Sequence, residues 1–531
     1  MRSGVGREQA NLYNGLRICL ASGSGVLLAC SFGRASRAGQ APRKGITVVT
    51  GPRLEKILVA NRGEIAVRIM RSAQELDLKV VAIYEETDKE SFHIMRADEA
   101  VCIGPGPRRD YLNIDKIIQA AKDTGAQAIH PGYGFLSENP EFPEACTQAG
   151  IVFIGPPPEV IRNMGSKVIA RRIAGQAGIP VIPASPSLSR GDKEEEEALA
   201  FAREYGYPVM IKAVSGGGGR GIRRVDNDRA LVAGLKQSRA EAMISFGNDD
   251  VYLEKGVHRP QHVEVQILAD KFGTVVHLGT RNCSIQRRHQ KLLEIAPSGL
   301  ARPLTARICE AAVRMARAAN YFSAGTVEFL VAPDDTFYFL EVNTRIQVEH
   351  TVTEVVTGID MIREQLLIAQ GEPISFSQEQ VVERGYAIQV RINAEDPKND
   401  FLASPGEVQV YQSSMGHGVR LDGTIYQGYV ITPFYDSLMV KLTVSGFTWQ
   451  EAVDRLHRTL KGFLILGVKT TIPFFHQIVH DPDFIMRRLD TSYLDEHPQL
   501  LEYQEEEREV DKIARLIAEI NAQGMNPFAF K

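Results

Sequence analysis

Cysteine is scarce in this chain of 531 residues, and neither sign of charge is in large excess, with 61 basic and 65 acidic residues. The six cysteines include no Cys-x-x-Cys pair, which argues against a zinc site or a disulfide scaffold and fits a reducing compartment. The formal net charge of −4 gives no electrostatic case for binding nucleic acid or an anionic membrane. No uninterrupted apolar run approaches the roughly 20 residues that cross a bilayer, so we expect no membrane segment.

The composition is that of a globular protein with several domains, because 44% of the residues are hydrophobic and the chain is long. Strands and helices alternate near the start of the predicted folded part. A strand at residues 57–60 is followed by a turn at Gly63, a helix to Glu75 and a second strand at residues 80–84. This alternation predicts a parallel α/β unit.

Polar side chains alternate through residues 339–354, after a short apolar strand. Alternate residues of an extended segment share one face, so five polar groups are predicted to point the same way: Glu341, Asn343, Arg345, Gln347 and Glu349. Oxygen ligands suit Mg²⁺, a guanidinium fits a small oxyanion, and Glu349 is placed to act as its base. The alternative is an edge strand with a solvated polar face.

A second acidic strand favours the metal site. Glu328 is the one charge in the apolar run 325–331, and the turn-rich residues 332–336 predict a hairpin with the strand that carries Glu341. Antiparallel pairing would bring the two carboxylates together as ligands of Mg²⁺. A lone buried glutamate is more often a paired structural residue, but two on adjacent strands favour a metal.

Four consecutive glycines, residues 216–219, lie between Lys212 and Arg220, with strand-like segments on either side. The match to the dinucleotide pattern G-x-G-x-x-G is weak because no helix follows, and no Gly-Lys-Ser/Thr of a P-loop is present. A glycine flap between two strands can close over phosphates with its backbone amides. An ordinary flexible hairpin is the alternative.

When the glycine flap and the polar segment are taken together with further motifs, residues from about 56 to 495 resemble a biotin carboxylase of the ATP-grasp superfamily. The motifs that carry the resemblance keep the order of that family: residues 56–66, 130–139, 164–167, 212–221, 283–291, 343–350 and 391–397. Two small departures are Asn282, where the family usually has aspartate, and Ile295, where many members have a second glutamate.

The resemblance implies a role for each matching residue. The nucleotide would be held by Lys167, Lys212, Gly218, Gly219, Glu254, Lys255, Val257, His262, Gln286 and His289. Mg²⁺ or Mn²⁺ would bind Glu328, Glu341 and Asn343. Bicarbonate would be held by Lys291, Arg345, Gln347, Val348 and Glu349, with Arg391 between bicarbonate and biotin.

Some of these residues also have a structural alternative. Either of the two histidines His262 and His289 could be structural, and Arg391 could simply pair with Glu395 or Asp396.

The implied reaction has two halves. Bicarbonate attacks the terminal phosphate of MgATP to give carboxyphosphate, with Glu349 as base and with positive charge from Lys167, Lys212 and Lys291. Carboxyphosphate then yields CO2 and phosphate. The phosphate removes the biotin N1′ proton, and Arg391 stabilises the ureido enolate that attacks CO2.

The implied fold is α/β with several domains. Residues 54–164 would form a parallel α/β domain and residues 165–371 an ATP-grasp domain, with a mobile lid at about 182–254. Residues 384–495 would form a mixed β domain that closes the site. The helical spacing of apolar residues predicts a tail helix at about 502–522, within the tail 496–531, and we favour its packing on the body over packing on a partner subunit.

Residues 1–53 are set apart by composition, since arginine is frequent and Glu8 is the one acid among the first 50 residues. This composition is typical of a transit peptide. The alternative, which we favour, is a non-native N-terminal extension. We therefore expect a cytoplasmic enzyme, with an organelle-targeted one as the second possibility.

The resemblance also implies the partners. The Met-Lys-Met run that carries biotin in this family is absent from the chain, so a biotin carboxyl carrier protein and a carboxyltransferase are expected on separate chains, with a homodimer of this one. Motifs such as residues 350–354 and 467–473 are closer to pyruvate carboxylases than to acyl-CoA carboxylases. Two other classes stay open: an ATP-grasp ligase that makes amides through acyl phosphates, and a non-catalytic nucleotide-binding scaffold.

Overall fold

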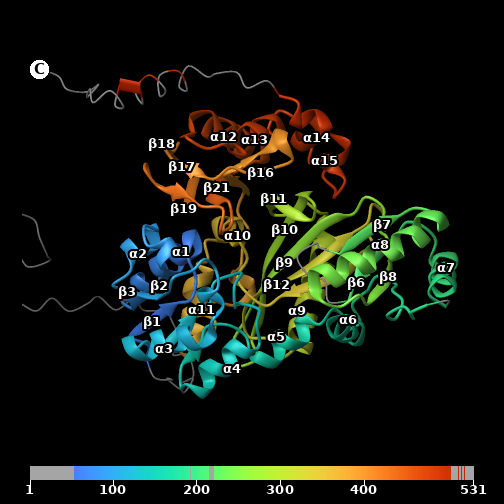
Figure 1. Cartoon of the computed structure of the whole chain (residues 1–531), viewed down its shortest axis with the longest axis horizontal. Helices are drawn as coiled ribbons and strands as arrows, with labels where there is room; N and C mark the ends of the chain where they lie inside the picture. Colours follow the sequence, from blue (N-terminus) through green and yellow to red (C-terminus); the bar gives the residue numbers. More distant parts are fainter. Residues whose placement is uncertain are drawn as a thin grey trace, which may run out of the picture. The chain divides into compact units, whose positions relative to one another are not determined.

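The computed structural model describes residues 53–191, 193–214 and 221–503, with isolated helical positions 512, 516, 519 and 520 (Figure 1). Residues 1–52, the two glycines predicted to bind phosphate and most of the predicted tail helix lie outside the described residues. Within the described part, no helix is both long and apolar enough to cross a membrane.

A five-stranded parallel sheet forms the first part of the described chain, as the alternation of strands and helices predicted. Its order is β3-β2-β1-β4-β5, with the bounds β1 Lys56–Val59, β2 Lys79–Glu85, β3 Glu99–Gly104, β4 Ala128–His130 and β5 Val152–Phe153. Helices α1 (Gly63–Glu75), α3 (Ile114–Thr124) and α4 (Glu141–Gln148) connect these strands or follow them. Helix α1 begins just after the carboxyl end of β1, and the residues of its first turn line the cavity described below.

An eight-stranded antiparallel sheet carries most of the predicted site. Its order is β13-β12-β9-β10-β11-β14-β21-β19, with the bounds β9 Gln261–Ala269, β10 Val275–Arg287, β11 Gln290–Ala296, β12 Ser323–Val331, β13 Phe337–Asn343, β14 Tyr386–Asn393, β19 Val419–Gly423 and β21 Leu438–Gly446. The sheet therefore continues without a break from the segment predicted as ATP-grasp into the segment predicted as the last domain. This continuity places charged residues of β14 and β21 next to those of β9–β13.

Apolar helices and strands cover this sheet. Helix α9 (Arg302–Ala318) packs on β9 and β10 through Ile308, Ala312 and Met315, which recur at helical spacing and are buried. Helix α12 (Trp449–Gly462) packs on β21, and α10 (His350–Thr357) packs on β14 and β10. These helices fix the sheet that holds the polar residues.

A small three-stranded antiparallel sheet forms the predicted lid, with β6 (Val209–Ala213) between β7 (Ile222–Val225) and β8 (Val251–Lys255). The two strands expected on either side of the glycines are thus confirmed. Helices α7 (Lys193–Tyr205) and α8 (Asp228–Phe246) pack against each other and share an apolar core with this sheet (Figure 1). Three glutamates after Lys193 lie in the first turn of α7.

Candidate active site

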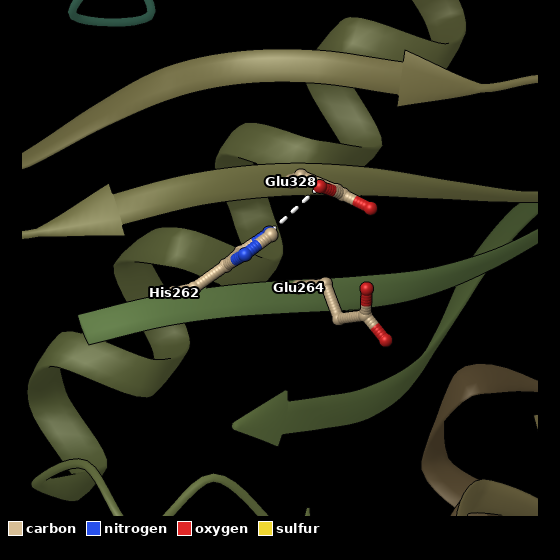
Figure 2. A group of neighbouring side chains, drawn as sticks. All are labelled: His262, Glu264 and Glu328. Carbon is tan, nitrogen blue, oxygen red and sulfur yellow. Dashed lines mark hydrogen bonds and ion pairs between the residues drawn. The ribbon is translucent and has the colours of Figure 1, made fainter. Parts of the chain in front are cut away.

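Three carboxylates lie in one row across the eight-stranded sheet. The strand registers pair Glu264 of β9 with Glu328 of β12, and Glu328 with Glu341 of β13. The prediction that a hairpin brings Glu328 and Glu341 together is confirmed. Figure 2 shows Glu264 beside Glu328, with His262 from the same face of β9 bonded to Glu328 through Nε2 at 2.7 Å.

The ammonium of Lys291 is the counterion of two carboxylates of this row and of Glu349. Its Nζ lies 2.5 Å from Glu264, 2.8 Å from Glu328 and 2.7 Å from Glu349. Burial opposes the charge, but these three carboxylates hold the pKa of Lys291 well above its usual range. Burial likewise opposes the charge of Glu328, and yet Lys291 and His262 hold its pKa well below its usual range. The base of the cavity is therefore an ionised network.

Glu341 differs from the other two carboxylates, because among the described residues its side chain makes no hydrogen bond or salt bridge. Burial and the neighbouring charge of Glu328 raise its pKa. Asn343 lies beside them and donates to Glu328 at 2.8 Å. Two adjacent carboxylates, of which Glu341 has no salt bridge among the described residues, with an amide oxygen close by, are a donor set that fits Mg²⁺ or Mn²⁺.

Residues 345–349 do not continue the strand, so the predicted alternation on one extended face is wrong beyond Asn343. Strand β13 ends at that residue, the chain bends, and α10 begins at His350. The loop is held instead by Arg281, which is fully buried and donates to Gln347 at 2.8 Å and to Thr353 at 2.9 Å. A buried guanidinium must have its donors satisfied, which fixes the loop over the edge of the sheet.

Glu349 is bound on both sides by cations. Its Oε1 accepts from Lys291, and its Oε2 accepts from Arg391 Nη2 at 3.1 Å. Arg391 Nε also donates to Glu294 at 2.7 Å, so the alternative that Arg391 pairs with Glu395 or Asp396 is wrong. Burial opposes ionisation of Glu349, but Lys291 and Arg391 together hold its pKa far below its usual range.

Arg345 lies at the other side of the loop. Its Nη2 donates to Asn343 at 3.0 Å, and its Nε lies 3.2 Å from Glu138 of the first segment of the chain. The guanidinium is partly exposed to the cavity. It is thus oriented by two oxygen acceptors while part of its surface stays open to a small anion.

The nucleotide residues surround the same cavity. The carboxylate of Glu254 is bonded to Lys212 and to Arg171, the latter at 2.9 Å. Lys255 Nζ donates to the carbonyls of Gly206 and Tyr207 at 3.1 and 2.8 Å. Both charged side chains of the segment predicted to bind adenine are therefore held by other residues of the chain.

His262 and His289 have different surroundings. His262 is buried and receives a hydrogen bond from Gln286 besides its contact with Glu328. His289 follows Arg288 in the turn between β10 and β11, and both have positive φ angles, 63° and 49°. Such angles are strained for residues other than glycine, and strained turns of this kind are common at binding sites.

One cavity of about 1180 Å³ joins these groups. Every predicted site residue that the structure describes lines it: Lys167, Lys212, Glu254, Lys255, Val257, His262, Gln286, His289, Lys291, Glu328, Glu341, Asn343, Arg345, Gln347, Val348, Glu349 and Arg391. The predicted residues Gly218 and Gly219 lie outside the described residues. A cavity of this size accommodates a nucleotide together with smaller substrates.

Several known proteins are similar to this chain in sequence and in fold. The chain is 50% identical to biotin carboxylase from a Nostoc species, over 84% of this chain and 99% of that protein. The chain belongs to the biotin carboxylase family. The family descriptions that match are the biotin carboxylase N-terminal domain at residues 53–161, the carbamoyl-phosphate synthase L chain ATP-binding domain at 166–377 and the biotin carboxylase C-terminal domain at 389–496.

Two further relatives differ in length and context. Pyruvate carboxylase from Bacillus subtilis is 47% identical over 89% of this chain, but the chain spans 42% of that protein. The biotin carboxylase domain dimer of 2-oxoglutarate carboxylase from Hydrogenobacter thermophilus, solved with MgADP, ADP and bicarbonate, has a TM-score of 0.82 and 46% identity. That match covers 85% of this chain and 99% of the solved one.

Several residues of this biotin carboxylase site were not predicted from the sequence. Glu264, Arg281, Glu294 and Glu138 each contact a predicted site residue directly. Glu264 and Glu294 are the single acidic residues of β9 and β11, a signal like the one that had identified Glu328. Arg281 lies in a strand with many polar residues and carries no such signal. Glu138 lies in a motif of the resemblance and carries no such local signal.

We expect the pH dependence of biotin carboxylation to report Glu294. Burial raises the pKa of this carboxyl from 4.5 to about 6, against the attraction of Arg391. As pH falls through about 6, Glu294 loses the charge that holds Arg391, so the rate of biotin carboxylation should fall. The stability of the folded state should depend on pH in the opposite sense. Because the pKa of Glu294 is raised in the folded state, its contribution to stability weakens as pH rises from 4.5 to 6.

The measurement is the rate of biotin carboxylation between pH 5 and 8 for the wild type and for Glu294→Gln. Glutamine keeps an acceptor for Arg391 but does not titrate. The variant should be slower and should lose the limb near pH 6. Equal pH profiles for the two proteins would contradict the assignment.

Proposed function

We propose that this protein carboxylates biotin on a separate carrier protein, with ATP and bicarbonate as the other substrates. It would do so as the biotin carboxylase subunit of a multi-chain carboxylase. The observation that carries this proposal is the junction at Glu349, whose two carboxylate oxygens contact Lys291 and Arg391. One carboxylate is thus shared between the predicted bicarbonate side and the predicted biotin side of the cavity.

In the first half of the reaction, bicarbonate binds between Arg345 and Lys291, and Glu349 removes its proton. A carboxylate with so low a pKa is ionised at neutral pH and accepts a proton only from an acid held against it. A bicarbonate oxygen bonds to the terminal phosphorus of ATP while the bond to the leaving ADP oxygen breaks, which gives carboxyphosphate. Bound at Glu328, Glu341 and Asn343, Mg²⁺ would neutralise charge on the phosphates.

In the second half, carboxyphosphate divides into CO2 and phosphate. Phosphate removes the proton from N1′ of biotin, and Arg391 stabilises the negative charge that develops on the ureido oxygen. The nitrogen then bonds to CO2. Glu294 orients Arg391 for this step through the contact at Nε.

The partners, the final acceptor, the oligomeric state and the compartment are proposed from the sequence motifs, the similar solved domain and the cysteine usage. Carrier and carboxyltransferase are proposed on separate chains, and the carboxylated acceptor is proposed to be pyruvate, with an acyl-CoA as the alternative. The motifs closer to pyruvate carboxylases support this choice. A homodimer is proposed because the similar Hydrogenobacter domain is a dimer, and the cytoplasm is proposed because the cysteine usage fits a reducing compartment.

The proposed function is tested by the substrate dependence of ATP cleavage. We expect ATP turnover to require bicarbonate and to be stimulated by free biotin. Turnover that requires an amino acid and ignores biotin would favour an amide-forming ligase. Nucleotide binding without turnover under any of these conditions would favour a binding scaffold.

A further inference from the structure

Lys441 is a fully buried lysine beside the active site, and it contacts two segments that lie far apart in the chain. Its Nζ lies 2.9 Å from Glu64 in the first turn of α1. The same atom donates to the backbone carbonyl of Val348 at 3.1 Å, in the loop before α10. Glu64 and Val348 line the cavity, whereas Lys441 is not among its lining residues.

The contact with Val348 bears directly on Glu349. The carbonyl of Val348 and the N–H of Glu349 belong to one peptide group, which is planar. Fixing the direction of that carbonyl therefore fixes the direction of the Glu349 N–H and the position of its Cα. A buried ammonium is strongly disfavoured without partners, and the Val348 carbonyl is one of the partners of Lys441.

Strand register places Lys441 directly beside Arg391. The two residues are partners in the β14–β21 ladder, and directly paired residues of antiparallel strands extend to the same face. Arg391 holds the carboxylate of Glu349 at 3.1 Å, and Lys441 holds the peptide on which Glu349 is built. Two cations of adjacent strands thus hold both ends of one acidic residue.

Glu64 completes the arrangement on the other side. Its carboxylate is buried, accepts from the hydroxyl of Tyr133 and faces Lys441. Burial raises the pKa of Glu64, and the charge of Lys441 opposes this rise. The position of α1 is thereby linked to the position of the Val348 carbonyl through a single ammonium.

We propose that Lys441 is a positioning residue for the bicarbonate step: it holds the Val348–Glu349 peptide in place, with Glu64 as its buried counterion. The proposal rests on the proposed function, because Glu349 is there the base that deprotonates bicarbonate. Lys441 acts through Glu349 and touches no substrate.

The first test is Lys441→Met, which keeps the length of the side chain and removes its donor. Displacing a catalytic group by a fraction of an ångström to one ångström can cost roughly a hundredfold, and we expect a loss of about that size in kcat/KM for bicarbonate. The dissociation constant for ATP should change by less than about threefold, since Lys441 bonds to Glu64 and Val348 and to none of the residues predicted to hold the nucleotide. A purely structural role predicts instead a lower fraction of active protein with unchanged kcat/KM per active site, counted by nucleotide-binding stoichiometry.

Two companion variants keep the test decisive if Lys441→Met alone folds poorly. The double variant Glu64→Gln/Lys441→Met contains no unpaired buried charge, so its melting temperature should recover while its kcat/KM for bicarbonate stays low. Glu64→Gln alone keeps the donor to Val348 and should lose much less activity than Lys441→Met. Recovery of kcat/KM in the double variant, or equal losses in the two single variants, would overturn the proposal.

The wild type separates this inference from the function on which it rests. If wild-type ATP cleavage ignores bicarbonate, the proposed function is wrong. If the wild type depends on bicarbonate and Lys441→Met has unchanged kcat/KM, the function stands and the role of Lys441 is wrong.

Discussion

Replacing Glu349 with glutamine is expected to lower the rate of bicarbonate-dependent ATP cleavage by about a hundred- to ten-thousandfold, the usual contribution of a general base. Glutamine fills the same volume but cannot take a proton. ATP should still bind with similar affinity, because Lys212 belongs to a separate three-stranded sheet and Glu349 is bonded to Lys291 and Arg391 instead. Initial rates of ADP formation at saturating bicarbonate, with and without biotin, measure the effect.

A matched control for this variant is Glu364→Gln. Glu364 is also a buried glutamate, but it accepts from Ser375 and does not line the cavity. The control should retain activity within a few-fold of the wild type. An unchanged rate in Glu349→Gln would remove Glu349 from the reaction, and equal losses in both variants would point to general destabilisation.

The second large effect is expected for Arg391→Ala. The guanidinium is proposed to stabilise the enolate of biotin, and loss of a preorganised donor of this kind typically costs about a hundred- to a thousandfold. Biotin carboxylation should fall by that factor. Bicarbonate-dependent ATP cleavage should fall less, because Lys291 still holds Glu349 at 2.7 Å.

Arg391→Lys is the informative companion, since it keeps the charge but loses the contacts of a planar guanidinium with Glu294 and Glu349. Its rate of biotin carboxylation should lie between those of the alanine variant and the wild type. Carboxylation of free biotin, followed as incorporation of labelled bicarbonate, separates the two half-reactions. If both half-reactions fall equally in both variants, Arg391 does not act on biotin.

The sequence predicted the strands and helices of this site better than the contacts between residues that are distant in the chain. The hairpin of Glu328 and Glu341 was predictable because a turn-rich segment separates two apolar strands that each carry one charge. The α/β unit at the start was predictable because strand, glycine turn and helix alternate. In both cases neighbouring residues along the chain decide the structure.

The course of residues 345–349 could not be predicted, because it depends on a distant residue. Alternating polar groups indicated an extended strand, but Arg281 of β10 binds the loop and a helix follows at once. Glu294 and Lys441 were missed for a related reason. Their contacts follow from the register of β11, β14 and β21, which local sequence does not determine.

The fate of oxygen from bicarbonate shows which group attacks ATP. If bicarbonate held between Arg345 and Lys291 attacks the terminal phosphorus of ATP, ¹⁸O-labelled bicarbonate must transfer one labelled oxygen to each phosphate released during biotin carboxylation. We predict singly labelled phosphate, seen by mass spectrometry or by the isotope shift in ³¹P spectra, in an amount equal to carboxybiotin. Unlabelled phosphate formed together with carboxybiotin would show that water or another group attacks ATP, and would contradict the account.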